Sequence, residues 1–321
     1  MKMNVKVNTN LTEGTASTLK AKPALLLPLV AGMTTAVIWG ISFLFTKDAL
    51  NYTFPLQILG LRFAAAALTI TLLMALRIVK INLRGKGLGA LLVLSFVQPF
   101  LYFIGETWGV KWTTASEAGM IIGLAPVAIA LMASIFLHER MRPLQMVSIG
   151  CSVLGVFVIV GAQGQFSLGE HLLGVLALFL AVISTGVYSI LSKKSSQRFT
   201  PVEITYVMMW IGAVLFNLIG LAQAALQGNL LGYLAPLRHS AVVMAVLYLG
   251  VLSSVGAFFL FNYALSRLSV TQSAPLINLT TVVSVTGGVI FQHDPFGWVE
   301  AAGAVLIILG VWGTNYIRRS P

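Results

Sequence analysis

The sequence has few charged residues and a single cysteine. Asp, Glu, Lys and Arg make up 9% of the 321 residues, whereas soluble domains contain about a quarter. Hydrophobic residues make up 58% and the mean hydropathy is +0.92, which excludes a water-soluble domain and indicates a chain that lies in a bilayer. Because the one cysteine, Cys151, stands in an apolar run, an intramolecular disulfide is impossible and thiol chemistry is not expected.

Motifs for nucleotide, metal and catalytic chemistry are also missing. The glycines at 85–89 lack the preceding strand that a nucleotide-binding turn requires, and no P-loop Gly-Lys-Ser/Thr is present, which excludes ATP-driven transport by this chain. No catalytic pair clusters within an apolar run. The histidines are scattered in predicted loops without metal-ligand spacing: His138, His171, His239 and His293. We therefore expect no enzyme, no metal and no cofactor.

Ten apolar stretches are each long enough to cross a bilayer as a helix. A spanning helix needs about 20 mainly apolar residues, and such runs are not the alternating strands of a membrane barrel. The first follows a polar tail at 1–22 and is too long for the core of a signal peptide. The sequence thus predicts an all-α integral membrane protein with ten transmembrane helices at about 25–46, 56–77, 88–107, 115–137, 143–161, 170–192, 202–226, 241–264, 270–291 and 297–317.

The basic residues fall mainly on one side of this arrangement. If the N-terminus is cytoplasmic, the cytoplasmic tails and loops hold 16 of the 20 Lys and Arg, the bias expected of a multi-pass protein with both termini inside. The net charge of +11 is therefore a signal of topology, and nucleic acid is not expected as a partner. The expected partners are the lipid bilayer and a small-molecule substrate, and the expected location is the cell inner (plasma) membrane.

The two halves of the chain contain an internal repeat. At an offset of 146, Lys47 aligns with Lys193 and Pro55 with Pro201, and at an offset of 155 the run from Ser116 aligns with the run from Thr271. Each half holds five predicted helices, and because five is odd the second half enters the membrane from the opposite face. This inverted repeat is typical of secondary transporters, whose site lies between the halves. The predicted units are a cytoplasmic tail at 1–22, a first repeat at 23–161, a connecting loop at 162–168, a second repeat at 169–317 and a cytoplasmic tail at 318–321.

Several short motifs, in this order, resemble those of one known family. They are Trp39-Gly40, Leu61-Arg62-Phe63, Ala115-Ser116-Glu117-Ala118-Gly119, Leu124-Ala125-Pro126, His138-Glu139-Arg140, Gly155-Val156 and Gly310-Val311. Over about residues 28–316 the chain resembles the drug/metabolite transporter superfamily, specifically the EamA-type ten-helix permeases. Two departures, Thr281 in place of a second Pro126 and Asp294 in place of Glu, weaken any expectation that both halves gate identically. The resemblance implies export or facilitated movement of amino acids or similar small metabolites across a bacterial inner membrane, without fixing the substrate.

Polar and aromatic side chains within the predicted spans are candidates for the lining of a substrate cavity. An amide in a bilayer needs a partner or a watery cavity, although ordinary helix packing is the alternative for each of these residues. We expect them to converge on a central cavity lined by helices 1, 3, 4, 6, 8 and 9 that opens to one face at a time. The candidates are Trp39, Gln98, Tyr102, Tyr188, Asn262 and Asn278.

Charged residues and one proline are candidates for charge recognition, proton transfer or gating. Arg62 lies within helix 2 and is expected to face the bundle interior, either as a contact for a substrate carboxylate or as a structural ion pair. Glu106 and Glu117 are each a candidate partner of Arg62 or a proton carrier, with a solvated helix-end carboxylate as the alternative. We expect Arg62 and Glu106 near the outer mouth.

The remaining candidates lie at a predicted break and at two helix ends. Pro126 falls at the centre of helix 4, where it marks either a hinge near a binding site or a tolerated kink. Glu139 and Asp294 follow helices 4 and 9 and are either symmetry-related gate latches or ordinary helix-end charges.

Two classes of function fit a chain of this kind, a gradient-driven transporter and a non-transporting sensor or scaffold. A sensor is expected to carry a sizeable soluble domain, and the longest loop, at about 227–240, is too short for one. The sequence therefore favours a secondary transporter that works by alternating access. Import of small organic solutes and multidrug export remain alternatives to amino-acid export, and proton coupling stays open.

Overall fold

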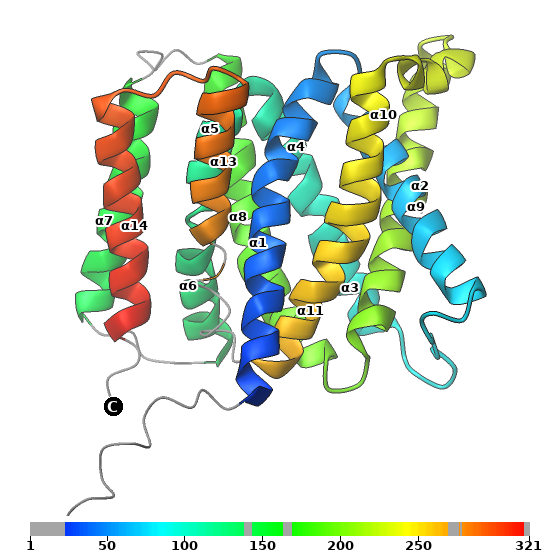
Figure 1. The fold of residues 1–321 in the computed structure, drawn as a ribbon, viewed down its shortest axis with the longest axis horizontal. Helices are drawn as coiled ribbons and strands as arrows, with labels where there is room; N and C mark the ends of the chain where they lie inside the picture. Colours follow the sequence, from blue (N-terminus) through cyan, green and yellow to red (C-terminus); the bar gives the residue numbers. More distant parts are fainter. Residues whose placement is uncertain (1–22, 138–142, 163–168, 269–275, 277, 318–321) are drawn as a thin grey trace, which may run out of the picture.

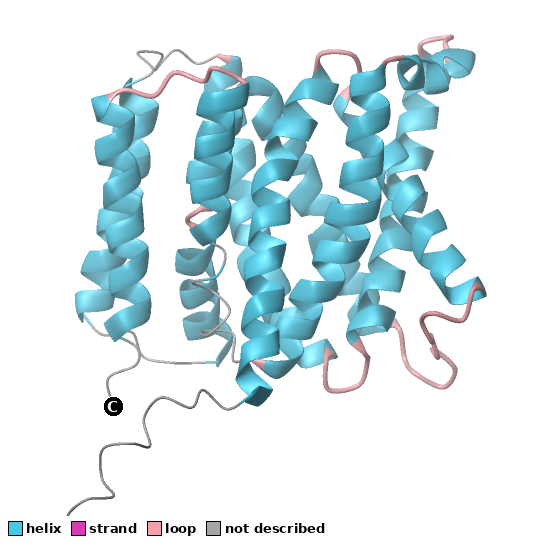
Figure 2. Cartoon of the chain, in the orientation of Figure 1, coloured by secondary structure: helices cyan, strands magenta, loops and turns pink. Residues whose placement is uncertain are grey.

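The computed structural model describes residues 23–137, 143–162, 169–268, 276 and 278–317, and the regular structure within them is helical (Figure 2). Its first part consists of α1 (Pro23–Leu50), α2 (Pro55–Ala75), α3 (Gly89–Ser95), η1 (Phe96–Leu101), α4 (Tyr102–Trp112), α5 (Ala115–Ile122), α6 (Ala125–Leu137) and α7 (Pro143–Ala162). The second part consists of α8 (Glu170–Ser195), α9 (Pro201–Leu226), η2 (Leu230–Arg238), α10 (Ser240–Leu247), η3 (Tyr248–Ala257), α11 (Phe258–Arg267), α13 (Asn278–Phe291) and α14 (Trp298–Ile317).

Within the described residues, seven helical runs are long and apolar enough to cross a membrane. They are Leu26–Leu50, Pro55–Ala75, Gly89–Trp112, Ala115–Phe136, Glu170–Ser195, Pro201–Leu226 and Ser240–Arg267. Shorter apolar segments follow in α7, α13 and α14, where the sequence predicts the fifth, ninth and tenth spans. The chain is thus an all-helical, multi-pass membrane protein, as the composition predicted, while the count of ten spans stays a prediction.

Helices α2 and α9 begin in the same way. Pro55 and Pro201 each occupy the first helical position, where the missing proline N–H leaves no intrahelical bond unmade. Ahead of α9, the Thr200 hydroxyl accepts the Glu203 N–H while the Glu203 carboxylate accepts the Thr200 N–H, which completes a capping box. The sequence signals that place these two helix starts are therefore local.

Two of the spanning runs are broken near their middle. In the third run Gln98 has an extended backbone (φ −146°, ψ 114°) between α3 and α4, because the following Pro99 disfavours the helical conformation in the residue before it. The Gln98–Pro99 peptide bond is cis. In the fourth run α5 ends at Ile122 and α6 begins at Ala125, so that Pro126 lies in the first turn of α6. The prediction did not include the break at Gln98.

The helices run between two opposite faces of the molecule (Figure 1). The connections at 51–54, 227–239 and 292–297 lie on the upper face in this view, and those at 76–88 and 196–200 lie on the lower face, where α14 also ends. Helices α7 and α14 pack side by side at one end of the molecule and α2 packs with α9 at the other. Between these pairs stand α1, α4, α8, α11 and α13, which surround the interior described next.

Candidate functional site

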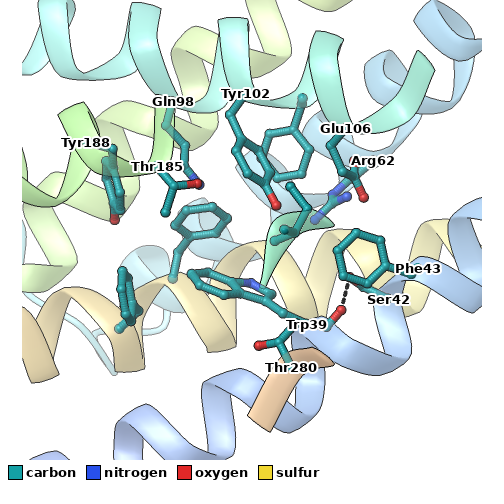
Figure 3. Close-up of a pocket in the computed structure, with 14 residues that line it drawn as sticks. Trp39, Ser42, Phe43, Arg62, Gln98, Tyr102, Glu106, Thr185, Tyr188 and Thr280 are labelled. Carbon is teal, nitrogen blue, oxygen red and sulfur yellow. Dashed lines mark hydrogen bonds between the residues drawn. The ribbon is translucent and has the colours of Figure 1, made fainter. Parts of the chain in front are cut away.

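A small enclosed cavity lies in the middle of the helix assembly. Helix α1 contributes Trp39, Ser42 and Phe43, and the other lining residues are Arg62, Gln98, Tyr102, Phe103, Glu106, Ile122, Thr185, Tyr188, Phe258, Phe261 and Thr280 (Figure 3). The lining therefore comes from the predicted helices 1, 3, 4, 6, 8 and 9 and also from helix 2, through Arg62. The cavity volume is about 20 Å³, the space of one water molecule, so the structure is closed around its site.

Arg62 is a fully buried cation that borders this cavity. Its side chain is 2% exposed, its Nε donates a hydrogen bond to Ser254 Oγ (2.9 Å) and its Nη2 donates to Ser253 Oγ (3.0 Å). The guanidinium carbon lies 4.2 Å from the centre of the Phe103 ring, a favourable cation–π contact. A cation inside a membrane span costs free energy unless such partners or a ligand stabilise it.

Glu106 is the carboxylate on the same cavity. It is 1% exposed, and the Thr107 hydroxyl donates a hydrogen bond to its Oε2 (3.2 Å). Arg62 and Glu106 influence each other electrostatically, yet no ion pair joins these two described side chains. Both residues line the cavity itself, whereas their positions in the sequence predicted a place near the outer mouth.

Aromatic rings form much of the cavity wall. The Trp39 ring packs edge-on against Phe258 and Phe261, with ring centroids 5.1 Å and 5.0 Å away, and its Nε1 donates to the Ser253 carbonyl (3.3 Å). In Figure 3, Trp39 lies between Arg62 on one side and Tyr188 on the other. Such a wall offers apolar contact to the body of a small solute.

Two polar side chains on the cavity have atoms without a partner. Gln98 and Thr280 are each 2% exposed, and the Gln98 Oε1 and the Thr280 Oγ1 make no hydrogen bond in the part of the chain that the structure describes. Buried polar atoms are nearly always satisfied, and leaving one unsatisfied costs about 1–3 kcal/mol. Unpaired atoms that border a cavity are therefore available to a solute.

A model of one known family matches both halves of the chain. The matching model is the EamA-like transporter family, and it covers residues 26–161 and again residues 172–316. The chain belongs to the EamA-like transporter family. This bears out the resemblance to the drug/metabolite transporters. The cavity is therefore the candidate binding site for a transported solute.

Curated relatives and a solved structure agree with the family. The uncharacterized transporter YcxC of Bacillus subtilis is 34% identical over 286 residues, covering 89% of this chain and 92% of the relative. A probable terminal-alkyne amino-acid exporter of Streptantibioticus cattleyicolor is 31% identical over 67% of this chain and 68% of the relative. A probable amino-acid metabolite efflux pump of Salmonella typhimurium is 25% identical over 87% and 92%. A crystal structure with 19% identity superposes with a TM-score of 0.64 over 90% of this chain and 98% of that one, which shows a shared fold.

Asn262, a predicted lining residue, is not part of the cavity wall of this EamA-like chain. Asn262 lies behind Tyr188: its Oδ1 accepts the Tyr188 hydroxyl (2.8 Å) and the Ser192 hydroxyl (2.7 Å), and its Nδ2 donates to Thr205 Oγ1 (3.1 Å). Its amide is thus satisfied by protein and holds Tyr188 in place. Asn278 begins α13, but its side chain lies outside the described residues.

Glu117 and Asp294, a predicted proton carrier and a predicted gate residue, are not among the lining residues of the cavity. The carboxylate of Glu117 pairs with His171 Nε2 at 2.9 Å, so the alternative that Glu117 pairs with Arg62 is wrong. Asp294 Oδ2 accepts the Ser116 N–H (2.9 Å) and so caps the start of α5. Glu139 lies outside the described residues.

Pro126 follows the break between α5 and α6, and Thr281 from the second half of the chain packs against this break. The Thr281 hydroxyl donates to the Gly119 carbonyl (3.0 Å), and a side chain at Gly123 would collide with that hydroxyl. Because Pro126 lies in a first helical turn, its missing N–H leaves no interior bond broken. The break is thus a packing site between α5 and α13.

Ser253 and Ser254, which hold Arg62, were not predicted from the sequence. Serine is common and unremarkable in a predicted span, but the internal repeat contains a signal for these two residues. At the offset of 155, Gln98 aligns with Ser253 and Pro99 with Ser254. The partners of Arg62 therefore occupy the repeat positions of the broken segment in the third span.

A second pocket of about 340 Å³ opens at the upper face, beside η2. Its wall contains amides and aromatic rings, and it includes none of the residues predicted to bind substrate. Burial raises the pKa of Tyr233 to about 12, so its hydroxyl stays protonated and donates to Asn217 Oδ1 (3.1 Å). This contact anchors η2 against α9.

Proposed function

We propose that this EamA-like protein is a secondary transporter that exports or equilibrates amino acids or related small metabolites through the central cavity by alternating access. The observation that carries the proposal is a closed cavity between membrane spans that joins a buried cation, a carboxylate, unpaired polar atoms and an aromatic wall. Cavities of this composition suit a small polar solute with an apolar part. The names of the relatives from Streptantibioticus cattleyicolor and Salmonella typhimurium point to amino acids or their metabolites.

The proposed architecture is ten spans in two inverted five-helix repeats. Pairs of residues related by the internal repeat line the same cavity: Trp39 with Thr185 at the offset of 146, and Phe103 with Phe258 at the offset of 155. Such pairing is expected where a pseudo-two-fold axis passes through a site. The twofold match of the family model to residues 26–161 and 172–316 gives further support.

The proposed topology places both termini in the cytoplasm of a cell whose plasma membrane holds the protein. The loops at 76–88 and 196–200 carry basic residues and share the lower face with the end of α14 (Figure 1). Basic loops remain preferentially on the cytoplasmic side of a membrane. Since the sequence has no nucleotide-binding motif, we propose that solute gradients drive transport.

Transport by the purified protein tests this proposal. Proteoliposomes containing only this chain are offered labelled amino acids one by one, with and without an imposed pH gradient. We expect saturable uptake of some of these amino acids above the level of protein-free liposomes. A change of the uptake rate in the imposed pH gradient would show that transport is coupled to protons. Rates equal to those of protein-free liposomes for the whole panel would refute the proposed function.

A further inference from the structure

Arg62 and Glu106 present opposite charges to one cavity from two neighbouring helices, α2 and α4. Each side chain is at most 2% exposed. Figure 3 shows the two at the same end of the cavity, and each is influenced by the charge of the other. Both residues are described in full, and neither ion pair found in the described chain joins them.

The contacts of Arg62 leave part of its guanidinium available. Its Nε and Nη2 donate to the two serines, whereas its Nη1 makes no hydrogen bond within the described part of the chain. A guanidinium has five N–H donors in a planar fork that matches a carboxylate. Ser253 and Ser254 therefore hold the plane of the guanidinium and leave some of its N–H donors available.

Glu106 is likewise only partly satisfied. Among the described residues its one donor is the neighbouring Thr107 hydroxyl, at 3.2 Å, although a carboxylate has about four acceptor sites. A buried cation and a buried anion that do not contact each other are incompletely stabilised, which costs free energy in a membrane interior. The arrangement is favourable when a ligand with both charges enters between them.

We propose that Arg62 and Glu106 form a clamp for the zwitterionic head of an α-amino acid, with the substrate carboxylate on Arg62 and its ammonium on Glu106. This inference rests on the proposed transport function and narrows its substrate to solutes that carry both charges on one carbon. When the substrate binds, the incompletely paired charges of Arg62 and Glu106 each gain a charge-assisted contact.

The rest of the cavity then receives the substrate side chain. In Figure 3 the ring of Tyr102 stands between the Arg62–Glu106 end and Gln98. A side chain that extends away from the clamp passes this ring and reaches the unpaired Gln98 Oε1. The clamp thus selects the head of the substrate, and the aromatic wall with Gln98 selects its side chain.

Charge-deleted substrates test the clamp on the wild-type protein. Uptake into proteoliposomes is measured for L-phenylalanine, L-leucine, L-threonine and L-glutamine, and for the N-acetyl and carboxamide derivative of each. Because a hydrogen bond to a charged group contributes about 1.5–3 kcal/mol, we expect each derivative of a transported amino acid to have a kcat/KM about tenfold to hundredfold lower. Derivatives transported as well as their parent amino acids would overturn the clamp. No transport of any amino acid or derivative would instead refute the proposed function.

Two variants then assign the charges to the residues. We expect Glu106→Gln to lose most of the discrimination against N-acetyl derivatives and to keep that against carboxamides, and Arg62→Gln to show the reverse pattern. Arg62→Lys, which keeps the charge, is expected to retain part of the discrimination if Arg62→Gln fails to fold. Glu170→Gln, at the exposed start of α8, is the matched control and should behave as wild type. Wild-type discrimination against N-acetyl derivatives in Glu106→Gln, or against carboxamides in a folded Arg62→Gln, would show that the clamp assignment is wrong.

Discussion

Lys47 and Lys193 bind the carbonyl ends of two different helices at opposite faces of the molecule. The Lys47 ammonium donates to carbonyls at the end of α4, those of Val110 (2.9 Å), Lys111 and Thr113. The Lys193 ammonium donates to the equivalent carbonyls at the end of α11, those of Leu265 (2.9 Å), Ser266 and Leu268 (2.7 Å). The two lysines are related by the internal repeat, and each compensates the negative end of a helix dipole.

Replacing either lysine should destabilise the protein by a similar amount. Lys47→Met and Lys193→Met each leave a set of helix-end carbonyls without their cationic donor, at a cost of about 1–3 kcal/mol. Thermal unfolding of the purified variants in detergent measures the loss, and Lys111→Met, whose ammonium has no such role, is the matched control. A large loss for one lysine with none for the other would contradict their equivalence.

The proposed topology predicts which face a reagent reaches in intact cells. In a Cys151→Ser background, Leu231→Cys on η2 should react with an impermeant thiol reagent, because its side chain is fully exposed on the upper face. Arg84→Cys, in the loop at 76–88, should react only after the membrane is permeabilised. The opposite labelling pattern would reverse the assignment of the faces.

Residues that bind the solute and residues that only pack helices should respond differently to replacement by alanine. Gln98→Ala and Tyr102→Ala should cut uptake at least about tenfold while the purified variants stay monodisperse, because each removes a contact with the solute. Asn262→Ala should instead lower thermal stability, because it leaves the Tyr188 and Ser192 hydroxyls without their acceptor. If Gln98→Ala and Tyr102→Ala both transport at the wild-type rate, these side chains only pack helices.

Gly105 marks a close approach of α4 to α8. A methyl group at this position would collide with the Ala177 carbonyl and lie 3.0 Å from the Ala181 nitrogen, and backbone atoms cannot rotate away. We therefore expect Gly105→Ala to lose about 1–3 kcal/mol of stability. Gly89→Ala is the control, since nothing lies within 4 Å of its added carbon. Equal thermal stability of the two variants would show that the helices can separate without cost.

Hydrophobicity predicted where the helices run, and Pro126 marked the break in the fourth span, but the break at Gln98 was not predicted. The start of α9 followed from Pro201, because a proline at a first helical position is a local signal. The break at Gln98 depends on Pro99 inside a run that is apolar on average, and averaging over a window hides it. The third span also continues to Trp112, five residues beyond the predicted boundary at 107.

The candidate site was predictable by residue type and not by partner. Arg62, Gln98 and Glu106 stood out because polar groups inside spans are rare, and all three line one cavity. Which groups contact them depends on helix packing, which single-residue reasoning cannot supply. Glu117 shows the difference, since it resembles Glu106 in the sequence yet pairs with His171 on α8.

Counterflow is the measurement that tests alternating access through this cavity most directly. Proteoliposomes are loaded with an unlabelled amino acid that the protein transports and diluted into a trace of the same amino acid in labelled form. A carrier that exposes one cavity to one face at a time exchanges inner for outer solute, so we predict a transient accumulation of label above the outside concentration. The same overshoot should be absent for Gln98→Ala. Label that only equilibrates with the wild-type protein, without overshoot, would contradict the account.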